Sequence, residues 1–193
     1  MKIIITIIFI ICIYFIINKI YVNKSTKFLK KYMALIQHHD DKHKYINING
    51  IIHIEELENG SALIHGSINN LPDGLHGLHI HHSGNLSNGC ASLGGHYNPF
   101  NKDHGSRIIK KNNTIEINYE RHVGDLGNIS SNNSVSKFSF IDPLIKLDGD
   151  TNILGRSIVI HLGVDDLGKT NHVDSKTTGN SGERIACGII CIP

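Results

Sequence analysis

Short strand-like runs separated by turn signals constrain the fold of this chain more than any other feature. Each run is rich in β-branched residues or alternates apolar with polar residues, and Gly-Asn, Asn-Gly and Asp-Gly pairs separate the runs. The runs are residues 46–54, 62–68, 75–82, 114–119, 135–140, 157–161 and 184–190. Such a pattern is typical of an all-β sandwich or barrel and not of alternating βαβ units. We therefore expect one all-β core.

A His-x-His pair lies within the third run. His79 and His81 are two residues apart, so in a strand both side chains project from one face and can aim at a single metal ion. His96 follows after a loop that can carry a third ligand over the same site. Further ligand-type residues are His104, His122, Asp125 and His161. Imidazole suits copper and zinc, and a set of three His and one Asp fits a closed tetrahedral zinc site.

Seven motifs, taken together, resemble the copper/zinc superoxide dismutase family. They are Gly-Leu-His-Gly-Leu-His-Ile-His (74–81), Gly-Gly-His-Tyr-Asn-Pro (94–99), Asp-His-Gly (103–105), Arg-His-Val-Gly-Asp-Leu-Gly-Asn (121–128), Gly-Arg-Ser-Ile-Val-Ile-His (155–161), Asp-Asp-Leu-Gly (165–168) and Gly-Glu-Arg-Ile-Ala-Cys-Gly (182–188). The resemblance covers roughly residues 34–193, with the motifs in the family's order. It implies an eight-stranded Greek-key β-barrel, a flattened sandwich, with two long functional loops. Apart from the run at residues 114–119, we expect these loops, residues 84–124 and 162–183, to lack secondary structure and to be tethered by metal and disulfide.

Carried over position by position, the resemblance implies one copper and one zinc per subunit. The implied copper ligands are His79, His81, His96 and His161. The implied zinc ligands are His96, His104, His122 and Asp125. His96 would therefore bridge the two metals as an imidazolate. Arg184 would guide the substrate, and Cys90 with Cys187 would form a disulfide within the subunit.

Three further residues have supporting roles that the resemblance implies. Asp165 has the position of a carboxylate that ties a copper-ligand His to a zinc-ligand His, and such partners fix the orientation of the rings. His76 would pack and hydrogen-bond behind the copper site. Lys176 stands one place earlier than the family's usual steering lysine, and we expect it to attract superoxide together with Arg184.

The resemblance implies that superoxide is dismutated to dioxygen and hydrogen peroxide by alternating reduction and oxidation of copper. It also implies a homodimer and a copper chaperone as a partner. The alternative is a non-catalytic metal-binding relative, or one that sequesters a copper chaperone. Such a relative is expected to have lost a metal ligand or the arginine, whereas this chain keeps every ligand and Arg184. The pattern therefore favours the enzyme.

The N-terminal residues form a separate hydrophobic segment. Residues 3–17 are apolar except for Thr6, and the apolar character continues to Val22. About twenty helical residues span about 30 Å, the thickness of a bilayer core. We expect residues 1–32 to be a membrane anchor with a basic linker and residues 33–193 to be the dismutase domain. A cleaved signal peptide is the alternative, but residues 18–25 offer no small-x-small cleavage site.

Charge bears on the location and on the partners of the domain. Five lysines follow the hydrophobic segment and only Lys2 precedes it, so the positive-inside rule predicts a cytoplasmic domain. The Cys90 and Cys187 pair favours an oxidising compartment and hence the alternative, secretion after signal-peptide cleavage, although the resemblance implies a family that keeps its disulfide in the cytosol. In such a compartment five Asn-x-Ser/Thr sequons within residues 33–193 could be glycosylated. The sequons begin at Asn59, Asn85, Asn112, Asn128 and Asn132. Residues 33–193 hold 13 Lys and Arg against 17 Asp and Glu, a balance that argues against nucleic-acid binding.

The remaining histidines and cysteines carry weaker signals. We interpret the cluster of His38, His39 and His43 as a solvated polar turn, with a weak copper- or zinc-capture site as the alternative. His82 points to the strand face opposite His81 and is expected to be solvated. We expect His53, His65 and His172 to be ordinary surface or hydrogen-bonded residues, and Cys191 to be a free thiol.

Overall fold

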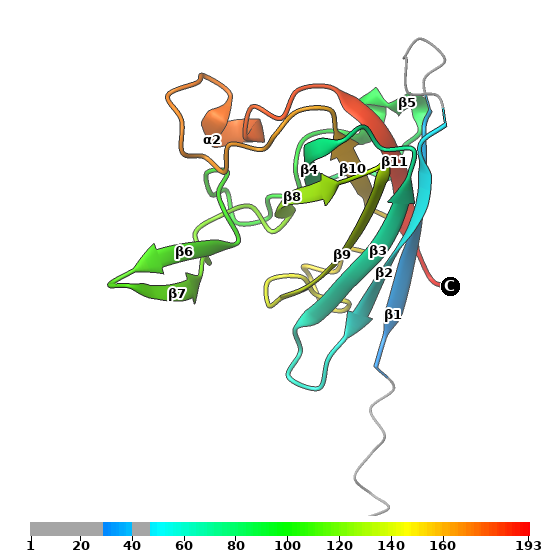
Figure 1. Ribbon diagram of the computed structural model, residues 1–193. Coiled ribbons are helices and arrows are strands. Elements are labelled where there is room, and N and C mark those ends of the chain that lie inside the picture. The colour runs from blue at the N-terminus through cyan, green and yellow to red at the C-terminus, as the bar shows by residue number, and fades with distance from the viewer. Residues whose placement is uncertain (1–28, 40–46) are drawn as a thin grey trace, which may run out of the picture.

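The computed structural model describes residues 29–39 and 47–193 (Figure 1). The hydrophobic segment at residues 3–22 lies outside the described residues, as does His43 of the first histidine cluster. Within the described ranges, no helix is long and apolar enough to cross a membrane. The anchor therefore stays a prediction.

Eight antiparallel strands form one sheet that curls into a nearly closed barrel (Figure 1). They are β1 (Lys31–Gln37), β2 (Asn49–Glu56), β3 (Ala62–Asn69), β4 (Gly74–His81), β8 (Asp125–Ser131), β9 (Val135–Asp142), β10 (Ser157–His161) and β11 (Arg184–Cys191). Their order in the sheet is β8-β4-β10-β11-β1-β2-β3-β9. The two strands at the ends of this order, β8 and β9, contact each other. The β3–β4 and β9–β10 connections cross between strands that are not neighbours, so the predicted Greek-key barrel is confirmed.

Five short elements lie in the two long loops, so the expectation that these loops lack secondary structure was wrong. They are β5 (Ser87–Cys90), η1 (Ala91–Leu93), β6 (Ile108–Lys111), β7 (Thr114–Ile117) and α2 (Ser175–Thr178). β6 and β7 form a separate two-stranded ribbon that projects away from the barrel (Figure 1). The run at residues 114–119 is thus a strand of this ribbon. Asn112 and Asn113 both adopt positive φ, which allows a tight hairpin turn between the two strands.

Two barrel strands were absent from the runs recognised in the sequence. β1 begins at Lys31, within the stretch that was expected to be linker, and Lys31 pairs with Glu55 of β2 in the sheet register and through an ion pair of 3.1 Å. β8 has few β-branched residues, and its strand conformation depends on pairing with β4. Pairing between distant segments overrides the weak local preference in both cases.

Alternation along the strands separates the core from the outer wall of the barrel. The inward positions include Ile36, Ile52, Ile54, Ile64, Ile68, Leu78, Ile80, Ile158 and Ile160, all fully buried. Each such side chain contributes about 1.5–3 kcal/mol when it leaves water. Because Leu78 and Ile80 face the core, His79 and His81 face the outer wall. The same argument places His161 of β10 on that wall.

Candidate metal centre

Six histidines and two aspartates gather between the outer wall of the barrel and the two long loops. Strands supply His79, His81, His161 and Asp125, whereas the loops supply His96, His104, His122 and Asp165. None of these residues is more than 8% exposed. The register of β10 against β11 shifts between Ile160 and His161, and such an irregularity re-aims the side chain that follows it. The strands thus hold four of these side chains in place, and the two long loops bring the other four over them.

One group consists of four histidines, each with a ring nitrogen within 4.8 Å of the others: His79, His81, His96 and His161. His81 Nδ1 lies 2.9 Å from the carbonyl oxygen of Gly94, and His161 Nδ1 lies 2.9 Å from that of Gly182. A carbonyl only accepts, so a neutral ring must donate from Nδ1 and leave Nε2 with a free lone pair. These two Nε2 atoms lie 3.4 Å apart. Backbone contacts thus orient both rings for metal binding.

The second group surrounds the carboxylate of Asp125. His96 Nδ1 and His122 Nδ1 lie 2.9 and 3.1 Å from its Oδ1. His104 Nδ1 lies 2.9 Å from the same oxygen but is not aligned to donate a hydrogen bond to it. Oδ2 accepts hydrogen bonds from the backbone N–H groups of Gly105 and His122. Three imidazoles and one carboxylate in this arrangement match a closed tetrahedral zinc site.

His96 belongs to both groups. Its Nδ1 contacts Asp125, while its Nε2 belongs with the four-histidine group. That Nε2 atom and His79 Nδ1 are buried and have no hydrogen-bond partner. Buried ring nitrogens are otherwise almost always partnered, so these two atoms fit coordination to a metal ion. The donor types and these two atoms agree with a centre for two metals that share one imidazole.

The protonation states suit metal binding in most of the centre. Burial holds the pKa values of His79 and His81 well below the usual range, and burial lowers the pKa of His161 to about 4. Burial also lowers the pKa of His104, but the carboxylates of Asp125 and Asp165 outweigh it and raise that pKa to about 9. Burial alone would raise the pKa of Asp125, yet the three histidines around it hold that pKa well below its ordinary value. Neutral imidazoles and an ionised carboxylate are the forms that bind metal.

Asp165 connects the two groups from outside. Its Oδ2 lies 3.0 Å from His79 Nε2, and its Oδ1 lies 2.7 Å from His104 Nε2. Asn128 holds the backbone of Asp165, because its side-chain amide donates to the carbonyl oxygen and its Oδ1 accepts from the N–H. Gly179, with φ of +64°, packs so closely on Asp165 and His104 that a Cβ there would overlap them. Neither Asn128 nor Gly179 was predicted to support the centre, because no local signal marks a contact with a distant loop.

Two buried side chains support the centre from behind. His76 Nδ1 lies 2.9 Å from the carbonyl oxygen of His161, as expected for a residue that packs behind that ligand. Arg121 is 1% exposed, pairs with Asp142 at 2.6 Å and donates hydrogen bonds to the carbonyl oxygens of His122 and Asp125. The guanidinium therefore fixes the turn that carries two ligand-type residues. Arg121 lies in a recognised motif, but its role became visible only in the structure.

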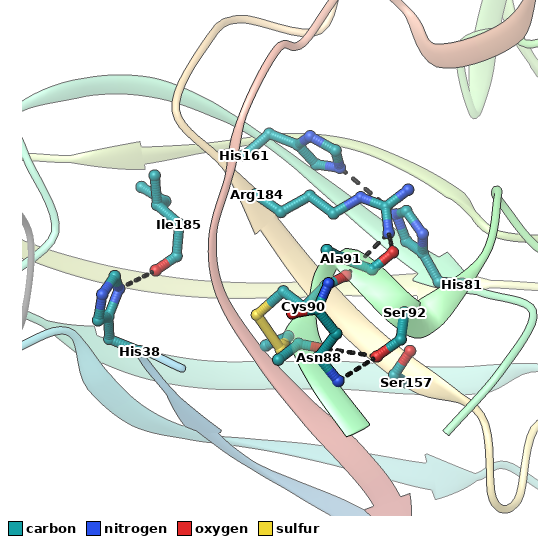
Figure 2. The surroundings of a disulfide bond; sticks show 12 residues. His38, His81, Asn88, Cys90, Ala91, Ser92, Ser157, His161, Arg184 and Ile185 are labelled. Carbon is teal, nitrogen blue, oxygen red and sulfur yellow. Dashed lines mark hydrogen bonds between the residues drawn. A yellow bond between two sulfur atoms is a disulfide. The ribbon is translucent and has the colours of Figure 1, made fainter. Parts of the chain in front are cut away.

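A disulfide and an arginine border the opening of the centre (Figure 2). The predicted Cys90–Cys187 disulfide is confirmed, and Cys191 is a free and exposed cysteine. Figure 2 shows Arg184 between the loop of Cys90 and the rings of His81 and His161. Its guanidinium donates to the carbonyl oxygens of Cys90 at 2.8 Å and of Gly94 at 2.7 Å.

A cavity of about 310 Å³ opens beside this arginine. Its wall consists of His81, Gly95, His96, His161, Asp174, Thr178, Asn180, Gly182 and Arg184. Lys176 is exposed and is not part of this wall, and its backbone carbonyl accepts a hydrogen bond from the N–H of His104. The histidines and the arginine of this wall can contact a small anion that enters the cavity from solvent.

A barrel of this topology with a paired His and Asp cluster defines a metalloprotein built for two transition-metal ions. The family model described as copper/zinc superoxide dismutase (SODC) matches residues 48–190, and the chain belongs to this family. It is 44% identical over 144 residues to superoxide dismutase [Cu-Zn] A of Xenopus laevis, covering 75% of this chain and 89% of that one. It is 49% identical over 149 residues to a putative superoxide dismutase [Cu-Zn] of Autographa californica nuclear polyhedrosis virus, covering 76% and 93%. A crystal structure of the clock protein EA4 superposes with a TM-score of 0.73 at 38% identity, covering 86% of this chain and 96% of that one.

Proposed function

We propose that this chain dismutates superoxide, converting two superoxide anions and two protons into dioxygen and hydrogen peroxide. The observation that carries the proposal is the shared position of His96. Its Nδ1 belongs to the group around Asp125, and its Nε2 faces the three other histidines without a hydrogen-bond partner. Membership of the copper/zinc superoxide dismutase family supports the same conclusion.

Each group has the donor types of one metal. The all-histidine group would hold copper, through His79, His81, His96 and His161. The group with a carboxylate would hold zinc, through His96, His104, His122 and Asp125. When bound, copper supplies the one-electron couple that the reaction needs, whereas zinc has no redox chemistry and polarises the ligand that it shares.

The remaining work belongs to side chains at the cavity. His96 belongs to the cavity wall, and we propose that its imidazole holds a proton for the product anion. Arg184 is half-buried, and its guanidinium offers a fixed positive charge to the incoming anion. Asp165 holds the rings of His79 and His104 in place and thereby fixes which nitrogen of each faces the metals.

A non-catalytic metal-binding relative, or one that sequesters a copper chaperone, is the competing proposal. Both ligand groups are complete, and the arginine borders a cavity that reaches His81, His96 and His161, which favours the enzyme. The deciding experiment measures copper, zinc and superoxide-dismuting activity of the full chain. One copper and one zinc per chain with activity would support the enzyme, whereas full metal loading without activity would support the alternative.

Assembly and location are further parts of the proposal. We propose a homodimer that receives copper from a chaperone, as the family resemblance implies. We also propose that residues 3–22 anchor the chain in a membrane with the catalytic domain on the cytoplasmic side. The length of the apolar segment supports the anchor, and the five lysines between residues 19 and 31 support this orientation. Secretion after cleavage of this segment is the alternative.

A further inference from the structure

The outer face of the barrel carries a second set of metal-ligating side chains on β2 and β3. His53 of β2 and His65 of β3 are direct partners in the antiparallel register. Their neighbours Ile52, Ile54 and Ile64 are fully buried in the core, so alternation places both histidines on the outer face. Neither strand contributes to the candidate metal centre. The His53–His65 pair is therefore separate from that centre.

The two imidazoles of the pair lie next to each other on the outer face. The two ring centroids lie 5.2 Å apart with an angle of 25° between the ring planes, so the imidazoles lie face to face. Glu55 is two residues from His53 and projects from the same face, and its Oε1 lies 3.9 Å from His65 Nε2. Two nitrogens that bind one zinc ion at about 2.0–2.1 Å lie about 3.3 Å apart. As placed in the structure, the ligand atoms of His53, His65 and Glu55 do not all lie within 4.8 Å of one another. Binding of an ion therefore requires rotation of the two half-buried rings about their side-chain torsions.

The surroundings leave the pair open to an ion from solvent. Both histidines line a shallow surface groove of about 790 Å³ together with Ser67, Lys137 and Ser139. Lys31 Nζ lies 3.1 Å from Glu55 Oε1 and competes with a metal ion for that carboxylate. The Lys31 side chain is 59% exposed, so its ammonium group can turn into solvent. The set thus offers two imidazoles and one carboxylate, which are ligands that copper and zinc accept.

We propose that His53, His65 and Glu55 form an accessory binding site for one divalent transition-metal ion, Cu²⁺ or Zn²⁺, on the outer face of the barrel. The two histidines supply the nitrogen ligands, and Glu55 supplies an oxygen ligand and negative charge. The site is solvent-accessible and has only three protein ligands, so water completes the coordination. It binds an ion in addition to the two that the catalytic centre would hold.

The test counts metal ions bound by the full chain in detergent, after loading with copper and zinc and removal of excess metal. All proteins carry His39→Asn and His43→Asn, because the first histidine cluster would otherwise add its own binding. Titration with Zn²⁺ is followed by calorimetry. We expect the background protein to bind one equivalent of Zn²⁺ beyond the ions of the catalytic centre. The affinity for this additional ion should be at least tenfold weaker in His53→Asn and in His65→Asn, and the loss of affinity should be smaller in Glu55→Gln.

The matched control is His82→Asn, which removes a single exposed histidine elsewhere and should leave the additional equivalent unchanged. The melting temperature of each variant tests whether the barrel is folded. We expect little change, because the substituted side chains lie on the outer face. Absence of the additional equivalent in the background protein would overturn the proposal. Unchanged affinity in a His53→Asn, His65→Asn double variant would also overturn it. Neither result depends on superoxide-dismuting activity, so failure of this site is distinct from failure of the proposed function.

Discussion

Arg184 donates a hydrogen bond from its guanidinium to the backbone carbonyl oxygen of Cys90 at 2.8 Å. Cys90 is also covalently joined to β11, the strand that carries Arg184. The loop between Cys90 and Gly94 is therefore held to one strand by a disulfide and by the side chain that faces the cavity. This arrangement couples the disulfide to the position of the arginine.

Loss of the disulfide should reduce both stability and activity. The bond spans 97 residues, and closing a loop of about 100 residues contributes up to about 4.7 kcal/mol in the chain-entropy model. For a domain of this size, Cys187→Ser should lower the melting temperature by roughly 10 °C or more. Calorimetry and activity assays measure the two effects. Cys191→Ser, which removes the exposed free thiol, is the control, and equal melting of the two variants would contradict this account.

Removal of one ligand from the all-histidine group should abolish copper binding and leave zinc binding intact. His81→Ala deletes a member of the all-histidine group and leaves His96, His104, His122 and Asp125 intact. We expect loss of copper and of activity, with zinc retained near one ion per chain, as measured by elemental analysis. The control is His82→Ala, because His82 is the adjacent and exposed residue. Wild-type activity in His81→Ala would show that the copper assignment is wrong.

Asp165→Asn should weaken both metal groups at once. The carboxylate contacts His79 at 3.0 Å and His104 at 2.7 Å, and an amide cannot accept a hydrogen bond at both of its polar atoms. Loss of such an outer partner typically costs 10–100-fold in metal affinity or activity. Competition titrations with chelators measure each affinity. Asp166→Asn is the control, because the half-buried Asp166 carboxylate accepts hydrogen bonds from Gly168 and Ser175 of its own loop. Metal affinities in Asp165→Asn equal to those in Asp166→Asn would contradict the bridging role.

Arg184 should act through both its charge and its hydrogen-bonding geometry. Arg184→Lys keeps the charge and should retain part of the activity, whereas Arg184→Glu should retain very little. Attraction of superoxide by Arg184 and Lys176 predicts a rate that falls as ionic strength rises. This slope should be shallower in an Arg184→Ala, Lys176→Ala double variant. Lys137→Ala, in the groove of the outer face, is the control, and equal slopes in all three proteins would exclude steering by either residue.

The membrane proposal predicts that the full chain stays in the membrane fraction through a high-pH carbonate wash. A chain that starts at residue 29 keeps β1 and the ion pairs of Lys30 with Asp148 and of Lys31 with Glu55, so it should be soluble and equally active. With a cytoplasmic domain, Asn59 and the four other sequons should carry no glycan in eukaryotic cells. A mobility shift reversed by a glycan-cleaving enzyme would contradict this orientation, and a shortened secreted chain would indicate a signal peptide.

Several features of the fold and site followed from local sequence because their physical causes are local. Alternation with a period of two residues predicted the all-β class, and it also placed His79 and His81 together on one face of β4. The resemblance to a family extended this to the eight-stranded barrel and to the Cys90–Cys187 pairing, both of which are confirmed. Strand β8 was missed, because its residues adopt strand conformation through pairing with β4.

The sequence by itself determined the all-β class and which residue types are available to bind metal, since both depend on side-chain chemistry and short-range periodicity. The family resemblance implied that Asp165 links two ligand histidines, but only the tertiary structure showed that it meets His79, 86 residues away, at 3.0 Å. Only the tertiary structure showed that Arg121 fixes the turn of His122 and Asp125. Close packing among distant segments produces such contacts, and no local pattern encodes the distances. The His53–His65 pair is a further example, because two residues that look ordinary in the sequence become neighbours only through the register of β2 against β3.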